Sequence, residues 1–266
     1  MRKVVALMRA NWLIASSYRL NLVITLLTLL ASIVPVYFIA GALQPVIEEH
    51  ISDQGGQYFA FVLVGLAAFS FLGVAVGTMP RAVGGGIGSG TLEVMMSTPT
   101  SVPTLLAGFL AYDLLWTAVR TMLLLGAGAV LGAQFDGSRL VPAAAILALT
   151  IIAYLPFGLI GAALILAFRT SGPLARVVTT ISALLGGVYY PTKVIPSWLE
   201  NVADLVPLTY GLRAVRRTLL EGEPVRAVLG DVSILVVFAA ALFAVGATAF
   251  TLALRYARRT GTLGHY

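Results

Sequence analysis

Residues 140–168 read LVPAAAILALTIIAYLPFGLIGAALILAF, a run without a single charged side chain. A helix needs about 20 apolar residues to cross the hydrocarbon core of a bilayer, so this run is long enough to span a membrane. Further uncharged runs of similar length occur at residues 20–47, 54–80 and 232–254. Their apolar residues are continuous, whereas the strands of a membrane barrel alternate apolar and polar residues. The sequence therefore predicts an all-α integral membrane protein.

The composition of the whole chain agrees with this fold class. Of the 266 residues, 59% are hydrophobic and only 11% are charged, against about 25% charged residues in a typical soluble domain. One water-soluble core could not bury so much apolar surface, which excludes a soluble enzyme and a disordered protein. Cysteine is absent, so the chain has no disulfides, no thiolate metal ligands and no cysteine nucleophile.

Two weaker runs complete the set of predicted spans. One is apolar but contains Asp113 and Arg120, and the other is short and rich in small side chains. We therefore predict six transmembrane helices in a single transmembrane domain that covers residues 1–266. The expected spans are 22–43, 58–80, 104–132, 142–167, 174–191 and 232–255.

The distribution of charge predicts the orientation of these spans. With six spans both termini lie on one side, and the segments on that side hold most of the Lys and Arg residues and a single acid, Glu93. Cytoplasmic loops carry an excess of Lys and Arg, so we expect a multi-pass protein of the cytoplasmic membrane with both termini in the cytoplasm. Arg213, Arg216 and Arg217 oppose this rule, but they lie in a long loop, where it is weaker. The positive charge is thus a topological signal, and no nucleic-acid partner is expected.

The two terminal segments are expected to contact membrane lipids. Residues 1–19 place Met8 and Trp12 on an apolar helical face beside Arg9, which fits an amphipathic helix in the inner interface. A basic flank that only anchors the orientation gives the same pattern. The basic tail after residue 255 is expected to contact anionic lipid.

The loop after the second span combines a glycine run with a predicted short helix. Five glycines lie within residues 84–90, but no Gly-Lys-Ser/Thr sequence follows them, so we interpret the run as a hinge and not as a phosphate loop. Residues 87–101 contain a short helix that ends near Pro99. A methionine-containing face can dock a partner protein, although a helix lying on lipid has the same pattern. This face comprises Leu92, Met95 and Met96.

Asp113 and Arg120 form the only pair of ionisable residues within a predicted span. They are about 10.5 Å apart along a helix and lie nearly on one face. Charged side chains in a span usually face a protein interior or a water-filled cavity and indicate function. The alternative is an interhelical contact that holds the bundle together, which we slightly favour.

The fifth loop is rich in proline and aromatic residues. Prolines divide residues 192–228 into helices that are too short and too charged to cross a membrane, so we expect them to re-enter it from the outside. Its aromatic side chains fit either a gate that lines the exit or a belt at the headgroup level, and the two roles are compatible. The residues that we assign to this candidate gate are Tyr189, Tyr190, Pro191, Trp198 and Tyr210.

Two segments resemble parts of ABC-2 type transporter permeases, the membrane subunits of ATP-binding cassette exporters. The first resembles the coupling-helix region and comprises Gly90, Thr91, Leu92, Glu93, Thr98, Pro99 and Ser101. The second resembles the signature before the last span and comprises Gly187, Tyr190, Pro191, Ile195, Pro196, Trp198, Leu199, Pro207, Leu208, Thr209, Tyr210 and Arg213. With the closing Gly261–Gly264, the resemblance covers essentially the whole chain.

The resemblance implies the following function. Such permeases form dimers and bind two cytoplasmic ATPase subunits, and the coupling helix carries the ATP-driven closure of these subunits to the spans. ATP and Mg²⁺ would lie on the partner, so this chain would bind no cofactor and would not be an enzyme by itself. The family usually exports drugs, lipids, lipid-linked glycans or polysaccharides. By the same match, Glu93 and its neighbours would contact the ATPase, and Tyr189 and Trp198 would lie near the exit.

A secondary transporter or channel that needs no ATPase is the alternative function. It would need ion sites within the membrane, for which only Asp113 and Arg120 are candidates, and carriers of this kind usually show two matching halves, which we do not find. An intramembrane enzyme is not favoured, because His50 and His265 lie on a loop and the tail, and no metal-ligating cluster occurs.

Overall fold

The computed structural model describes residues 8–9, 12–13, 19–90, 102–168 and 173–260. This part of the chain is helical and contains no strand. Five of its helices are long and apolar enough to cross a membrane, which confirms the predicted fold class of an all-α membrane protein. These helices are α2 (Arg19–Ile47), α3 (Tyr58–Gly88), α5 (Val102–Val130), α6 (Leu140–Phe168) and α10 (Leu229–Thr260).

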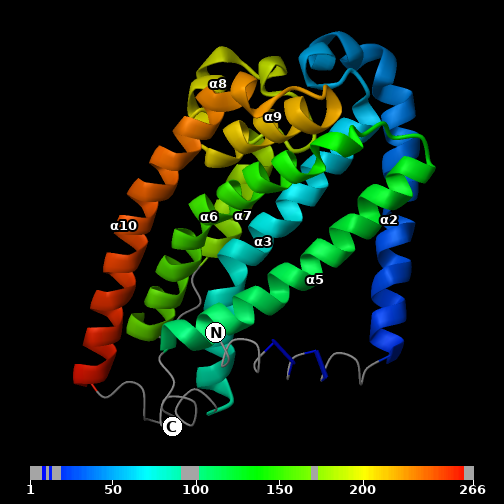
Figure 1. The fold of residues 1–266 in the computed structure, drawn as a ribbon. Coiled ribbons are helices and arrows are strands. Elements are labelled where there is room, and N and C mark those ends of the chain that lie inside the picture. The colour runs from blue at the N-terminus through cyan, green and yellow to red at the C-terminus, as the bar shows by residue number, and fades with distance from the viewer. Residues whose placement is uncertain (1–7, 10–11, 14–18, 91–101, 169–172, 261–266) are drawn as a thin grey trace.

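The first four long helices, α2, α3, α5 and α6, alternate in direction, and α10 runs the same way as α6, as Figure 1 shows. The connections from α2 to α3 and from α5 to α6 lie at the same end of the bundle as the short helices α8 (Ser197–Ala203) and α9 (Pro207–Leu220). Two hydrogen bonds join these connections to the end of α9: Gly55 N–H donates to the Glu221 carboxylate over 3.0 Å, and Asp136 N–H donates to the Leu219 carbonyl over 2.8 Å. We call this end the outer end and the opposite end, where α10 finishes, the inner end.

The sixth predicted span, 174–191, contains a shorter helix, α7 (Leu174–Leu185), which leads from the inner end of α6 toward α8 (Figure 1). Its 12 residues extend about 18 Å, against about 30 Å of hydrocarbon. The helix stops because Gly186 and Gly187 follow, and Gly187 takes a left-handed conformation with φ +75°. The six-span layout is therefore not confirmed in full, since α7 alone is too short.

The glycine run that we expected to form a hinge instead forms the last turns of α3. Glycine weakens a helix by about 1 kcal/mol per residue relative to alanine. Burial offsets this cost here, because Val83 and Gly86 are buried and Val83 packs in a cluster with Leu106 of α5 and Ile165 of α6. The helix consequently reaches eight residues further than the predicted span, to Gly88.

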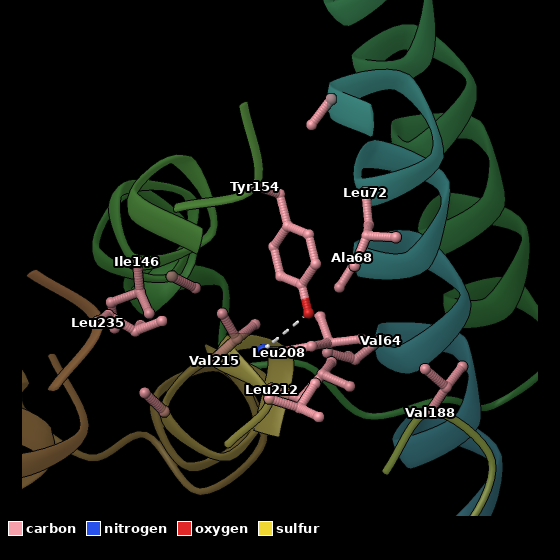
Figure 2. Close-up of a cluster of buried hydrophobic side chains, with 14 of the residues drawn as sticks. Val64, Ala68, Leu72, Ile146, Tyr154, Val188, Leu208, Leu212, Val215 and Leu235 are labelled. Atoms are coloured by element: carbon pink, nitrogen blue, oxygen red, sulfur yellow. Dashed lines mark hydrogen bonds between the residues drawn. The ribbon is translucent and has the colours of Figure 1, made fainter. Parts of the chain in front are cut away.

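The core is built around α3, which is the most buried of the long helices. In its most apolar window 72% of residues are buried, against 11% in α2. A helix that is apolar all round is expected to lie inside a bundle. Near the outer end α3 packs against α6 and α9 (Figure 2), in a cluster that includes Val64, Leu72, Ile146, Tyr154, Leu208, Leu212 and Val215. Near the inner end its partners are α5, α6 and α10, in a cluster that includes Met79, Val83, Leu110, Leu166 and Phe250.

Glycines allow these helices to approach closely. A Cβ atom on Gly158 of α6 would lie 2.5 Å from the Ala75 carbonyl oxygen of α3, and one on Gly246 of α10 would lie 2.9 Å from Pro156 of α6. Small residues at such contacts bring backbones together where the lipid provides no hydrophobic driving force. Glycine at these two positions therefore allows α6 to pack closely against α3, and α10 to pack closely against α6.

Candidate functional site

The outer end is covered by α8, α9 and the turn after α7 (Figure 1), which we call the outer cover, residues 186–220. Pro207 occupies the first turn of α9, where its missing N–H is not needed. Leu208, Leu212 and Leu219 then recur at helical spacing and are all buried. The short helices occur within the predicted region 192–228, and their depth in the membrane stays a prediction.

Arg216 lies on this buried face of α9 and is only 2% exposed. Its Nε and Nη2 atoms donate to the Phe61 carbonyl of α3 over 3.2 and 3.0 Å. Nη1 donates to the Gly187 carbonyl over 2.8 Å, and Nη2 also donates to the Val188 carbonyl over 3.1 Å. The guanidinium stacks on the Phe61 ring, 3.3 Å from its centroid. One side chain thus joins α9, α3 and the turn after α7.

The residues around Arg216 leave space for its guanidinium and supply its acceptors. A Cβ atom on Gly65 would lie 2.2 Å from the Val188 carbonyl oxygen and 2.8 Å from Nη2 of Arg216, so only glycine fits there. Burial lowers the pKa of Arg216 from its usual value to about 9, while the nearby Tyr58 acts in the opposite direction. The guanidinium therefore stays charged at neutral pH, and the backbone carbonyls provide its hydrogen-bond acceptors.

Tyr154 makes a second junction of three helices (Figure 2). Its hydroxyl lies 2.8 Å from Ser182 Oγ of α7 and accepts the Leu208 N–H of α9 over 3.3 Å. The first N–H groups of a helix have no partner within the helix, so this contact satisfies one at the start of α9. The tyrosine on α6 thereby joins α7 and the start of α9 to the bundle.

The predicted gate residues all lie in the outer cover. Tyr190 donates its hydroxyl to the Leu184 carbonyl, and Tyr210 donates to the Asp204 carbonyl over 3.0 Å. Tyr189 and Trp198 expose 43% and 68% of their surface. The tyrosines that hydrogen-bond locally brace the cover, whereas the exposed rings are free to contact lipid, substrate or another copy. The fifth predicted residue, Pro191, is buried.

Two of the three arginines that oppose the predicted orientation, Arg213 and Arg217, are paired with acids. Arg213 lies 3.4 Å from Asp231, and Arg217 lies 2.8 Å from Glu223. A hydrogen bond from Arg217 to Glu223 raises the pKa of Arg217 further. Arg216 is bound to backbone carbonyls instead, so each of the three arginines has a partner within the fold.

Asp113 and Arg120, the predicted intramembrane pair, do not form an ion pair within the described part of the chain. The Asp113 carboxylate instead accepts a hydrogen bond of 2.6 Å from the hydroxyl of Thr78. Thr78 belongs to α3 and is 3% exposed. The contact joins α5 to α3, as expected for the structural alternative. A functional role for either residue stays a prediction.

The predicted coupling segment lies mostly outside the described residues. Gly90 is described and adopts φ +68° just after α3, whereas Thr91, Leu92, Glu93, Met95, Met96, Thr98, Pro99 and Ser101 are not. The helices on either side end and begin at the inner end of the bundle (Figure 1). They pack against each other there, since Met79 and Val83 of α3 belong to one cluster with Leu106 and Leu110 of α5.

The comparison with known families agrees with this arrangement. A model of the ABC-2 type transporter family matches residues 2–220. The chain therefore belongs to the ABC-2 type transporter family. It is a multi-pass membrane protein of the transport-permease class, which generally works with a cytoplasmic ATPase subunit. No match was found among curated proteins.

Arg216 is not among the predicted site residues, although its spacing along α9 indicates a buried position. Arg216 stands four residues after Leu212 and three before Leu219, so a helical wheel places it on the apolar face of α9. An arginine in that position needs buried acceptors. The acceptors themselves, on Phe61 and in the turn after α7, are backbone atoms more than 20 positions away and leave no pattern in the sequence.

Replacing Arg216 is expected to loosen the outer cover. Arg216→Met keeps the volume but leaves the carbonyls of Phe61, Gly187 and Val188 unsatisfied, so we expect a loss of about 3 kcal/mol in the free energy of unfolding. Tryptophan fluorescence of the purified protein in detergent during heating measures this loss. Arg226→Met, at an exposed arginine, is the matched control, and equal unfolding temperatures for the two variants would contradict this role.

Thr78 and Asp113 are expected to be energetically coupled. Thr78→Val and Asp113→Asn each remove part of their hydrogen bond, so a double-mutant cycle should give about 1 kcal/mol of coupling. Arg120→Gln should leave thermal stability nearly unchanged, since it removes no described ion pair. Additive effects in the cycle would show that the hydrogen bond does not hold α5 to α3.

Proposed function

We propose that this chain is the permease subunit of an ATP-driven exporter in the cytoplasmic membrane. The family match carries the proposal, because ABC-2 permeases generally act with a cytoplasmic ATPase. In this proposal two ATPase subunits hold ATP and Mg²⁺, and residues 87–101 dock on them. The chain itself provides the path for a lipid, a lipid-linked glycan, a polysaccharide or a drug-like molecule.

The structure supports a mechanical role for α3 in this proposal. The helix has 31 residues and is about 46 Å long. Its outer part provides the Phe61 carbonyl to Arg216 of the outer cover, and its inner end leads directly into the coupling segment. Movement of the coupling segment would therefore reach the outer cover through a single packed helix, with α5 moving alongside.

The sixth crossing is also part of the proposal. Because α6 and α10 both run from the outer to the inner end, the chain must return between them (Figure 1). We infer that α7 and residues 186–191 together make this crossing, with both termini in the cytoplasm. A short helix followed by irregular backbone is tolerated at membrane depth when protein surrounds it.

A second copy of the chain would cover the outward face of α7. Val177, Ile181 and Leu184 lie on one stripe and are 45%, 45% and 53% exposed. Thr180 lies on the same stripe and is exposed, and polar side chains on a membrane helix usually contact another helix. We infer a dimer in which this face contacts its equivalent, so that the substrate path is built by two copies.

Single-cysteine labelling tests the six crossings, and the absence of native cysteine makes the reading direct. Ser197→Cys should react with a membrane-impermeant maleimide in intact cells, because it follows α7 at the outer end. Ser171→Cys, just before α7, should react only after the cells are permeabilised. Equal labelling of both positions in intact cells would mean that α7 does not complete a crossing.

Reversing the charge of Glu93 tests the coupling segment. Glu93→Arg is expected to lower the amount of ATPase subunit that copurifies with the tagged chain in detergent at least tenfold, since the charge change opposes docking while membrane insertion is kept. Glu49→Arg makes the same change at an exposed position of the outer end and should not alter recovery. Unchanged recovery with Glu93→Arg would remove this residue from the contact.

A further inference from the structure

A cavity of about 710 Å³ opens at the inner end between α3, α6 and α7. Arg81 and Gly85 of α3 line one side, Ile165 of α6 lies on another, and Ala175 and Arg176 belong to the first turn of α7. None of the residues assigned to the outer cover is among the described residues that line it. The cavity therefore combines two cationic side chains from different helices with apolar walls.

The two arginines of this cavity have no acidic partner within the described part of the chain. This contrasts with Arg213 and Arg217 at the outer end, which are paired with acids. Among the residues that the structure describes, no acidic one lines the cavity either. A pair of unneutralised guanidinium groups across a cavity attracts an anion, and phosphate and carboxylate match their planar donors best.

The side chain of Arg81 is exposed and runs back along α3. Side chains tilt toward the N-terminus of their helix, and α3 runs from the outer to the inner end, so Arg81 leans back toward the membrane interior. Its Nη2 atom lies 3.1 Å from the place where a Cβ atom of Gly77 would be. The missing side chain of Gly77 thus leaves room for the guanidinium of Arg81 beside α3.

The start of α7 adds to the attraction for an anion. Pro173, Ala175 and Arg176 line the cavity with the first turn of a 12-residue helix. The N–H groups of a first turn have no partner within the helix, and the helix dipole is positive there. Arg81 and Arg176 thus lie beside a backbone that also favours negative charge.

We propose that this cavity binds the anionic head group of an amphiphile, a phosphate or carboxylate carried on an apolar body, taken from the leaflet at the inner end. The volume is far larger than one small anion needs, and Ile165, Ala175 and Pro80 provide an apolar wall beside the arginines. The site requires only the described helices, so it stands independently of the proposed coupling to an ATPase.

Retention of phosphatidylglycerol by the purified chain tests the site without any ATPase. Native mass spectrometry in detergent, with phosphatidylcholine of the same chains as the neutral reference, should show preferential binding of the anionic lipid. Arg81→Gln and Arg176→Gln should each weaken it about fivefold, the effect of one arginine near a charged membrane surface. Arg226→Gln removes an exposed arginine at the outer end and should leave binding unchanged.

A pair of glycine variants tests whether the lipid preference depends on the cavity or only on positive charge at the surface. Cβ atoms on Gly85 and Gly88 would both meet nothing within 4 Å, but only Gly85 lines the cavity. Gly85→Leu should therefore abolish the preference for phosphatidylglycerol, and Gly88→Leu should preserve it. An equal loss with Arg226→Gln or Gly88→Leu, or no loss with Gly85→Leu, would overturn the proposal.

The source of the anionic group is tested by competition. Millimolar inorganic phosphate should not displace phosphatidylglycerol from the wild-type chain, because the ion makes no contact with the apolar wall. Displacement by phosphate would overturn the amphiphile as the ligand. In vesicles that contain the chain but no ATPase, we expect the bound phosphatidylglycerol to stay in its leaflet, as a resident lipid does. Passage of the lipid across the bilayer in these vesicles would contradict its role as a resident lipid.

Discussion

The contact between the Arg216 guanidinium and three backbone carbonyls holds the outer end together. Removing a charge from water costs several kcal/mol, and the contact repays this only when every donor has an acceptor. The acceptors come from α3 and from the turn after α7, so the charge is satisfied only when α9, α3 and this turn are assembled. Glycine at position 65 is a consequence, since any side chain would separate the turn from α3.

Because the same helix that carries Phe61 continues to Gly88, α3 is shared by both ends of the molecule. Its contact with α5 through Thr78 and Asp113 lies between the two ends. A polar contact inside a membrane bundle fixes how two helices sit against each other more specifically than apolar packing does, which allows them to move as a unit. The outer cover and the inner end of α3 are therefore linked through packed helices.

The fold class and the long spans could be predicted because uncharged runs report the bilayer directly. The end of the helix within residues 174–191 could not be predicted in this way, because hydropathy does not show where a helix ends in a turn. The left-handed conformation of Gly187 marks that turn. The glycine run after Pro80 misled us for the opposite reason: tertiary burial overrides low helix propensity. The sequence identified the outer aromatic region, but the carbonyls that hold Arg216 are backbone atoms and carry no residue signature.

The arginines of the outer end and those of the inner end differ in their partners, although a count of charges along the sequence treats them alike. At the outer end each arginine of α9 is bound to an acid or a carbonyl, so its charge is used within the fold. At the inner end Arg81 and Arg176 line a cavity without such partners among the described residues. Unpaired arginines can remain near a membrane only where lipid phosphate or water solvates them. The positive charges from which the orientation is predicted are thus also available at the inner end for the proposed anionic ligand.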